Sequence, residues 1–379
     1  MKKLLFYFVL CINIQFANAQ GPAIDKERLL EFYQDQRYAE AAQYLQQIYG
    51  TGSSDVKVLG QLAYCHLMSG HLPEAAFYYQ KIDSIQPGTL SVYFNLANIY
   101  SKRGNYVQTR NYLEKVIQID SMNFNALKQL PNFIDSLALR MVYLKKANLI
   151  RPTDADVAAD LADGYRKQKM AAQAYQVLQI AIAADTGNFV LQQQLLPIAN
   201  ELKKYQEVVT IGTRLLRNDQ DPNVLKDVGI AYFNLKKYDQ SLPLFSAIEK
   251  MAKQNETILY YMALCYRELK DYEMSTKYAV KTIDEGISPN TAFYYLFLGN
   301  IHEMKGQNNS AAAAYKKGLT FGQDRQLYYR LGLLNDLKFS KKSAAIGYYR
   351  LYLKSKPDAV KEKEQINYTQ ARIAALSNK

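Results

Sequence analysis

One residue pattern returns along this chain of 379 residues at intervals near 34 residues. In its clearest form Leu96 is followed by the small residue Ala97 and, three positions later, by Tyr100. The repeat positions equivalent to Ala97 are Ala63, Ala97, Ala162, Leu196, Gly229, Ala263, Gly299 and Gly332. They are 34, 65, 34, 33, 34, 36 and 33 residues apart, and the long interval equals two repeats. A fixed interval of this length indicates that each repeat is one structural unit that packs on the next.

Within a repeat the apolar residues are spaced as they are on one face of a helix. Leu59, Leu62 and Ala63 form one such stripe, and Tyr79 belongs to a second stripe after a turn at Gly70. Each repeat is therefore predicted to be two antiparallel helices of about a dozen residues. One pair of helices cannot bury both of its apolar faces, so the pairs are expected to stack.

These columns of small and aromatic residues resemble the tetratricopeptide repeat (TPR) family, which has the same period and the same order of residue types. The resemblance covers residues 22–357. It implies an all-α fold, a right-handed α-solenoid of about ten helix-turn-helix repeats. Residues 358–379 are polar and amphipathic, and we predict that they form a C-terminal capping helix.

Two repeats depart from the pattern, at residues 122–154 and 189–221. The first carries Pro131 and the second carries Pro197, each within a predicted first helix, and the second also has Leu196 and Gly212 at unusual positions. A proline inside a helix removes a hydrogen bond and crowds the preceding turn. We therefore expect kinks near residues 125–135 and 192–200.

Residues 1–19 have the pattern of a secretory signal peptide. Lys2 and Lys3 precede an apolar stretch, and Ala17-Asn18-Ala19 forms a small-residue cleavage site. The apolar stretch is about 11 residues long, whereas a membrane-spanning helix needs about 20. The protein is therefore expected to be exported, to the periplasm or alternatively to the extracellular space, with no membrane span after signal cleavage.

The sequence offers no recognisable catalytic, cofactor or metal site. His66 and His302 fall in the column that holds Tyr in other repeats, so packing explains them better than catalysis does. No Cys and His spacing suits zinc, and no glycine-rich phosphate loop follows a strand. Cys65 and Cys265 occupy the same slot of two repeats and are expected to be buried thiols.

Charge is uneven along the chain. Residues 20–199 contain 17 basic and 16 acidic residues, a net of +1, whereas residues 200–379 contain 28 and 19, a net of +9. A basic surface can bind nucleic acid, but the predicted export removes the protein from cytosolic nucleic acid. An acidic protein or peptide is the better candidate partner.

The resemblance also implies where a partner would bind, because first helices line the concave face of the family's fold. The corresponding positions in the later repeats carry rings with arginines and an amide beside them: Tyr260, Tyr261, Arg267, Phe293, Phe297, Asn300, Tyr329 and Arg330. Exposed rings supply large contact areas, and arginine suits a carboxylate. The alternative is that these rings pack between neighbouring repeats.

Two classes of function remain open at this point. The first is a non-catalytic protein-interaction scaffold of the bacterial cell envelope that binds a peptide segment or an envelope protein. The second is an envelope-glycan binding protein whose sugars would stack on the same rings. An enzyme is a third class, which no constellation of residues in the sequence favours.

Overall fold

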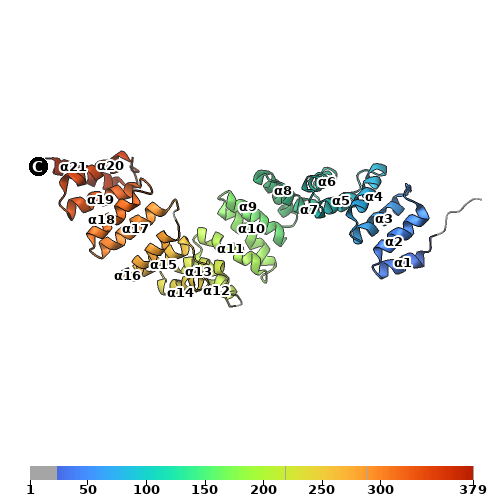
Figure 1. Cartoon of the computed structure of the whole chain (residues 1–379), viewed down its shortest axis with the longest axis horizontal. Coiled ribbons are helices and arrows are strands. Elements are labelled where there is room, and N and C mark those ends of the chain that lie inside the picture. Colours follow the sequence, from blue (N-terminus) through green and yellow to red (C-terminus); the bar gives the residue numbers. More distant parts are fainter. Residues whose placement is uncertain (1–23, 218, 287, 379) are drawn as a thin grey trace, which may run out of the picture. The chain divides into compact units, whose positions relative to one another are not determined.

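The computed structural model describes residues 24–217, 219–286 and 288–378. Within these residues the chain forms 21 α-helices and one short 3-10 helix, and no strand is found there. Figure 1 shows the helices following one another as antiparallel hairpins. The predicted all-α fold of paired helices is confirmed. The predicted signal peptide at residues 1–19 lies outside the described residues.

Contacts divide the chain into two compact units, one ending at Gly164 and the other beginning at Tyr165. The helices up to this boundary are α1 (Lys26–Gln34), α2 (Tyr38–Tyr49), α3 (Val56–Met68), α4 (Leu72–Ile85), α5 (Leu90–Lys102), α6 (Tyr106–Ile119), α7 (Phe124–Gln129), η1 (Leu130–Phe133), α8 (Leu137–Ile150) and α9 (Ala155–Lys167), which crosses it. The helices beyond it are α10 (Ala171–Ala184), α11 (Phe189–Glu201), α12 (Tyr205–Leu215), α13 (Pro222–Asn234), α14 (Tyr238–Lys250), α15 (Glu256–Glu268), α16 (Tyr272–Asp284), α17 (Thr291–Met304), α18 (Asn308–Gly318), α19 (Arg325–Leu337), α20 (Lys342–Lys354) and α21 (Lys363–Ser377).

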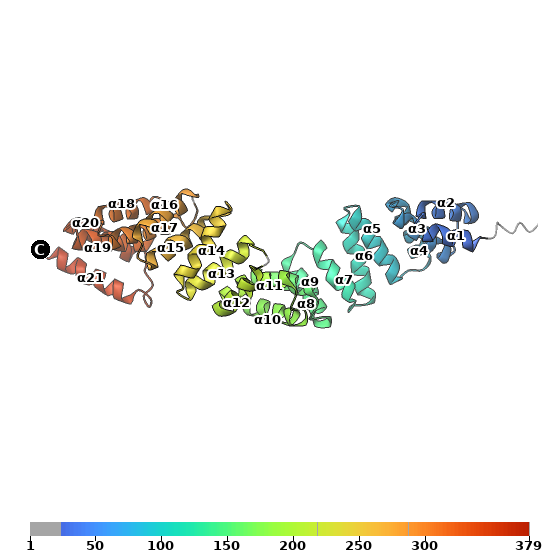
Figure 2. The same ribbon diagram turned by 90° about the horizontal axis from the view of Figure 1, so that it is seen from below.

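The helices α1–α8 of the first unit form four helix-turn-helix pairs and the helices α11–α20 of the second unit form five, as the repeat period predicts. Helices such as α15 and α16, or α17 and α18, lie side by side in both views (Figures 1 and 2). The tight turn within a pair needs a residue with positive φ. Gly70 and Gly104 supply it in two pairs, at φ values of 81° and 72°, because glycine adopts this conformation without steric cost.

The repeat positions lie where the two helices of a pair approach most closely. Ala63, Ala162 and Ala263 are completely buried. A Cβ atom added to Gly229 would lie 2.7 Å from Cε1 of Phe245, a ring on the second helix of the same pair. The small side chains therefore make room for large ones on the partner helix.

The aromatic column three residues after the repeat position makes ring stacks inside the pairs. Tyr100 stacks on Tyr112 with centroids 5.7 Å apart, and Tyr266 stacks on Tyr278 at 5.4 Å. His66 occupies the same column and stacks on Tyr78 at 5.5 Å. Burial lowers the pKa of His66, so the imidazole is neutral at pH 7 and serves as a packing ring.

The two prolines have different effects on their helices. Helix α7 has only six residues before the chain changes to the 3-10 helix that contains Pro131. Helix α11 continues through Pro197 without a break. Kinks are predicted near both prolines: the α-helix is interrupted near residues 125–135, whereas at residues 192–200 it is unbroken.

The C-terminal helix α21 packs on α20, as predicted for a terminal cap. It begins at Lys363, however, and not near residue 358. The carboxylate of Asp358 accepts hydrogen bonds from the backbone N–H groups of Val360 and Lys361, both at 3.0 Å. This local turn competes with helix formation and delays the start of α21.

Candidate partner-binding surfaces

Five rings of helices α15 and α17 form one group, which we name the Tyr260 cluster: Tyr260, Tyr261, Phe293, Tyr294 and Phe297. The ring of Tyr260 lies at its centre. Its centroid is 5.7 Å from that of Phe293, 5.3 Å from Tyr294 and 5.2 Å from Phe297. The structure thus brings together four of the predicted partner-binding rings and adds Tyr294, which the sequence analysis did not select.

The rings of this cluster differ in their exposure. Phe293 is 45% exposed, whereas Phe297, four residues later on the same helix, is only 4% exposed. The prediction that Phe297 is an exposed contact ring is therefore wrong. Tyr260 covers one side of this ring, and the Arg267 guanidinium lies 5.2 Å from its centroid. Phe297 packs between repeats, whereas almost half of Phe293 is exposed to solvent.

Of the other rings in the cluster, Tyr294 is buried, and Tyr260 and Tyr261 are half-buried. Burial raises the pKa of Tyr260 to about 12, so its hydroxyl stays protonated and can donate a hydrogen bond at neutral pH. Tyr261 stacks on Phe245 at 5.7 Å, which makes it a packing residue as well as a part of the surface. Arg267 forms an ion pair with Glu268, with Nε 3.0 Å from Oε1.

Asn300, Arg330 and Tyr329 belong to a second group, on helices α17 and α19. Tyr315 donates its hydroxyl hydrogen to Asn300 at 2.8 Å and also contacts Glu303, which pairs with Arg330 at 3.6 Å. The ring of Tyr329 lies 5.2 Å from that of Tyr352. These three predicted residues are partly exposed but already have partners within the chain.

The sequence analysis also missed a buried carboxylate on helix α13. The side chain of Asp227 is 6% exposed, and its Oδ1 lies 3.6 Å from Nζ of Lys226. Burial raises the pKa of Asp227 to about 6, although the charges of Lys226 and Arg166 oppose this effect and that of Asp221 adds to it. At neutral pH the carboxylate of Asp227 is therefore ionised, although its burial disfavours the negative charge.

Replacing Asp227 with Asn is expected to stabilise the protein at pH 7.5 by about 2–3 kcal/mol, since the pKa values of the folded and unfolded chains differ by about two pH units. The raised pKa in the folded state means that the unmodified protein loses stability as the pH rises from about 4 to about 6. The variant should lack this loss. Urea unfolding of both proteins at pH 4 and pH 7.5 measures the difference, and an equal gain at both pH values would contradict this explanation.

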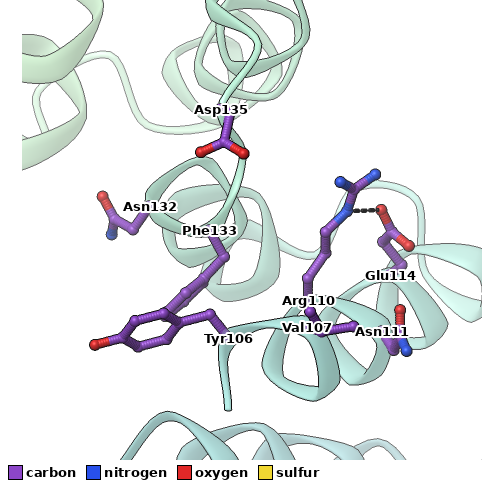
Figure 3. A pocket seen from close by; sticks show the side chains of 8 residues that line it. All are labelled: Tyr106, Val107, Arg110, Asn111, Glu114, Asn132, Phe133 and Asp135. Carbon is purple, nitrogen blue, oxygen red and sulfur yellow. Dashed lines mark hydrogen bonds and ion pairs between the residues drawn. The ribbon is translucent and has the colours of Figure 1, made fainter. Parts of the chain in front are cut away.

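A surface hollow lies in the first unit, beside the irregular repeat. Its volume is about 430 Å³, and its lining residues come from α6 and from the segment after α7: Tyr106, Val107, Arg110, Asn111, Glu114, Asn132, Phe133 and Asp135. Figure 3 shows these side chains arranged around the open space. The sequence analysis did not select them, although Pro131 marked the interruption that leaves the space open.

Residues 24–217, 219–286 and 288–378 contain no group of three or more His, Cys, Asp or Glu side chains that could hold a metal ion. In the same part of the chain, no helix has the length and apolar character needed to cross a membrane. Cys65 and Cys265 are buried free thiols.

The first six helices match a known family of helical repeats. Two models described as tetratricopeptide repeat match the chain, one over residues 32–96 and the other over residues 90–121. Residues 32–121 match tetratricopeptide repeats. The matched residues lie on α1–α6, and the later helices continue the same helix-turn-helix pairing typical of TPR solenoids.

Several solved structures are similar to this chain. A tetratricopeptide repeat protein from Parabacteroides merdae ATCC 43184 is 13% identical, with a TM-score of 0.45 over 70% of this chain and 98% of that one. The human IFIT1 dimer with PPP-AAAA is 14% identical, with a TM-score of 0.46 over 92% and 86%. MamA from Desulfovibrio magneticus RS-1 is 18% identical, with a TM-score of 0.41 over 44% and 94%.

Proposed function

We propose that this protein is a non-catalytic scaffold of the bacterial cell envelope that binds a peptide segment or an envelope protein. The TPR fold is commonly a protein-interaction scaffold, and the Tyr260 cluster offers a place for such a partner. The observation that carries the proposal is the exposed ring of Phe293, supported from below by Tyr260 at 5.7 Å. A ring held in this way supplies contact area with little loss of conformational freedom on binding.

The proposed location follows from the sequence of residues 1–19, which fits a signal peptide. Export to the periplasm is proposed first, and the extracellular space is the alternative. The proposed partner is acidic because residues 200–379 carry a net charge of +9 (28 basic and 19 acidic residues). Since Arg267 and Arg330 each pair with a glutamate, long-range attraction by the whole surface explains this preference better than one ion pair does.

Replacing Tyr260 and Phe293 together with Ala is expected to weaken partner binding at least tenfold, a loss of about 1.4 kcal/mol or more. The experiment captures partners of the full chain from its own cell envelope and then measures the affinity of each purified partner. Helical content, measured by circular dichroism, should be unchanged. The matched control replaces Tyr64 and Phe189, two exposed rings elsewhere in the chain, with Ala.

Treatment of the envelope extract separates the two kinds of partner. If protease treatment abolishes capture and glycosidase treatment does not, the partner is a protein or peptide. The opposite result would support an envelope glycan stacked on Phe293. Binding that persists unchanged in the double variant would place the site elsewhere and overturn the proposal.

A further inference from the structure

The hollow beside α6, which we name the α6 hollow, exists because one helix of the repeat array is too short. Most first helices of the pairs, such as α3, α5 and α15, have 13 residues, whereas α7 has only six. After α7 the chain turns through the 3-10 helix and reaches Asp135 instead of continuing along α6. At the start of α6, Tyr106 and Val107 are 59% and 70% exposed.

One wall of the α6 hollow is aromatic. The ring centroids of Tyr106 and Phe133 are 5.7 Å apart with an interplanar angle of 35°. Figure 3 shows these two rings together on one side of the open space. Phe133 also packs against the apolar core of the first unit, which fixes this wall in place. Val107 adds an aliphatic surface beside the rings.

The charged residues of the hollow carry a net charge of −1. Nε of Arg110 donates a hydrogen bond to Glu114 at 2.7 Å, so this arginine is already neutralised by a neighbour on its own helix. The second carboxylate, that of Asp135, is directed toward the open space from the opposite side (Figure 3). A positively charged group entering the hollow would therefore meet the Asp135 carboxylate and two rings, beside the Arg110 guanidinium, on which Glu114 acts most strongly and Asp135 more weakly.

We propose that the α6 hollow binds the side chain of a lysine or arginine of a peptide partner. The aliphatic stem of such a side chain would lie along Tyr106 and Val107, and its cationic end would reach Asp135 and the ring faces. A volume of about 430 Å³ is large enough for one such side chain. This inference rests on the proposed function as a peptide binder but uses a different surface from the Tyr260 cluster.

The test uses the full chain and short blocked peptides observed by saturation-transfer NMR. The probe is acetyl-Gly-Lys-Gly-amide, and its uncharged match contains norleucine in place of Lys. The lysine probe is expected to bind at least fivefold more tightly than the norleucine probe, and added salt should reduce this difference. Asp135→Asn and Tyr106→Ala should each weaken binding of the lysine probe at least fivefold. Asp239→Asn, at an exposed aspartate on α14, is the matched control and should change nothing.

Three outcomes would overturn the inference. Equal binding of the lysine and norleucine probes would show that charge is not recognised. Preferential binding of acetyl-Gly-Glu-Gly-amide would show that Arg110, not Asp135, recognises the ligand. If no probe binds while partner capture still depends on Tyr260 and Phe293, the α6 hollow is not a binding site, and the proposed function stands.

A different outcome would overturn only the proposed function. In that case the lysine probe binds as expected, but replacing Tyr260 and Phe293 with Ala does not change partner capture.

Discussion

Replacement of Gly299 with Ala is expected to destabilise the second unit by about 3 kcal/mol, the upper part of the range for overpacking a core. A Cβ atom at this position would lie less than 2.5 Å from the buried ring of Tyr315, and the next ring atom, Cδ1, would be 2.5 Å away. The ring cannot move aside easily, because Tyr315 is completely buried and its hydroxyl group is hydrogen-bonded to Asn300 and Glu303. The steric clash must therefore separate α17 from α18.

Urea unfolding monitored by circular dichroism measures this loss, and Gly347→Ala is the matched control. Gly347 lies within α20, and an added Cβ there would have no neighbouring atom within 4 Å. The control variant should be more stable than the unmodified protein by about 0.5–1 kcal/mol, because alanine restricts the unfolded chain. If the Gly299→Ala variant is as stable as the Gly347→Ala variant, α17 does not approach Tyr315 as closely as described.

The second large effect is expected from replacing Arg372 with Met, which should destabilise the protein because it leaves the carboxylate of Asp336 without its charged partner. The side chain of Asp336 is only 3% exposed, and Arg372 donates to its two oxygens at 2.8 Å and 2.7 Å. Tyr349 donates a third hydrogen bond at 3.1 Å. These three residues lie on α19, α21 and α20, so the ion pair holds the terminal helix on the last pair.

Hydrogen exchange of the α21 amides, measured with urea unfolding, checks this prediction. The Arg372 hydrogen bonds hold the pKa of Asp336 below its ordinary value, so their contribution is present at neutral pH and is lost as the pH falls below about 4. The effect of Arg372→Met should therefore shrink in acid. Adding Asp336→Asn should restore part of the stability at pH 7, and Arg350→Met, at an exposed position on α20, should have little effect. Faster exchange in both arginine variants would contradict a specific role for Arg372.

The repeat positions explain why so much of the fold could be predicted from the sequence. Ala63 and Ala263 are small because the second helix of the same pair packs closely on the first, and this requirement recurs along the chain. Such contacts are local, because the two helices of a pair are separated by only a short turn. A period near 34 residues therefore indicates both the helices and their pairing.

The repeat pattern did not predict where α21 starts or how the chain continues at the two prolines. Pro131 ends the α-helix soon after its first turns, but Pro197 is accommodated within α11. Both prolines lie in predicted first helices, so the sequence pattern alone treated them as equivalent. After Pro131 the chain forms η1, which lies against α6 and α8, and the sequence pattern does not contain these contacts.

The amino-acid sequence by itself determined the class of fold, the helix pairs and the group of rings on the later first helices, because these depend on spacing along one helix. Only the tertiary structure decided which of these rings a partner can reach. Phe293 and Phe297 are four residues apart on one helix face, and Tyr260 of the neighbouring repeat contacts both rings. Arg267 of that repeat lies over Phe297 as well, and Phe297 is buried whereas Phe293 is exposed. Exposure depends on what the adjacent helix places over a side chain, and the local spacing of residues does not contain that information.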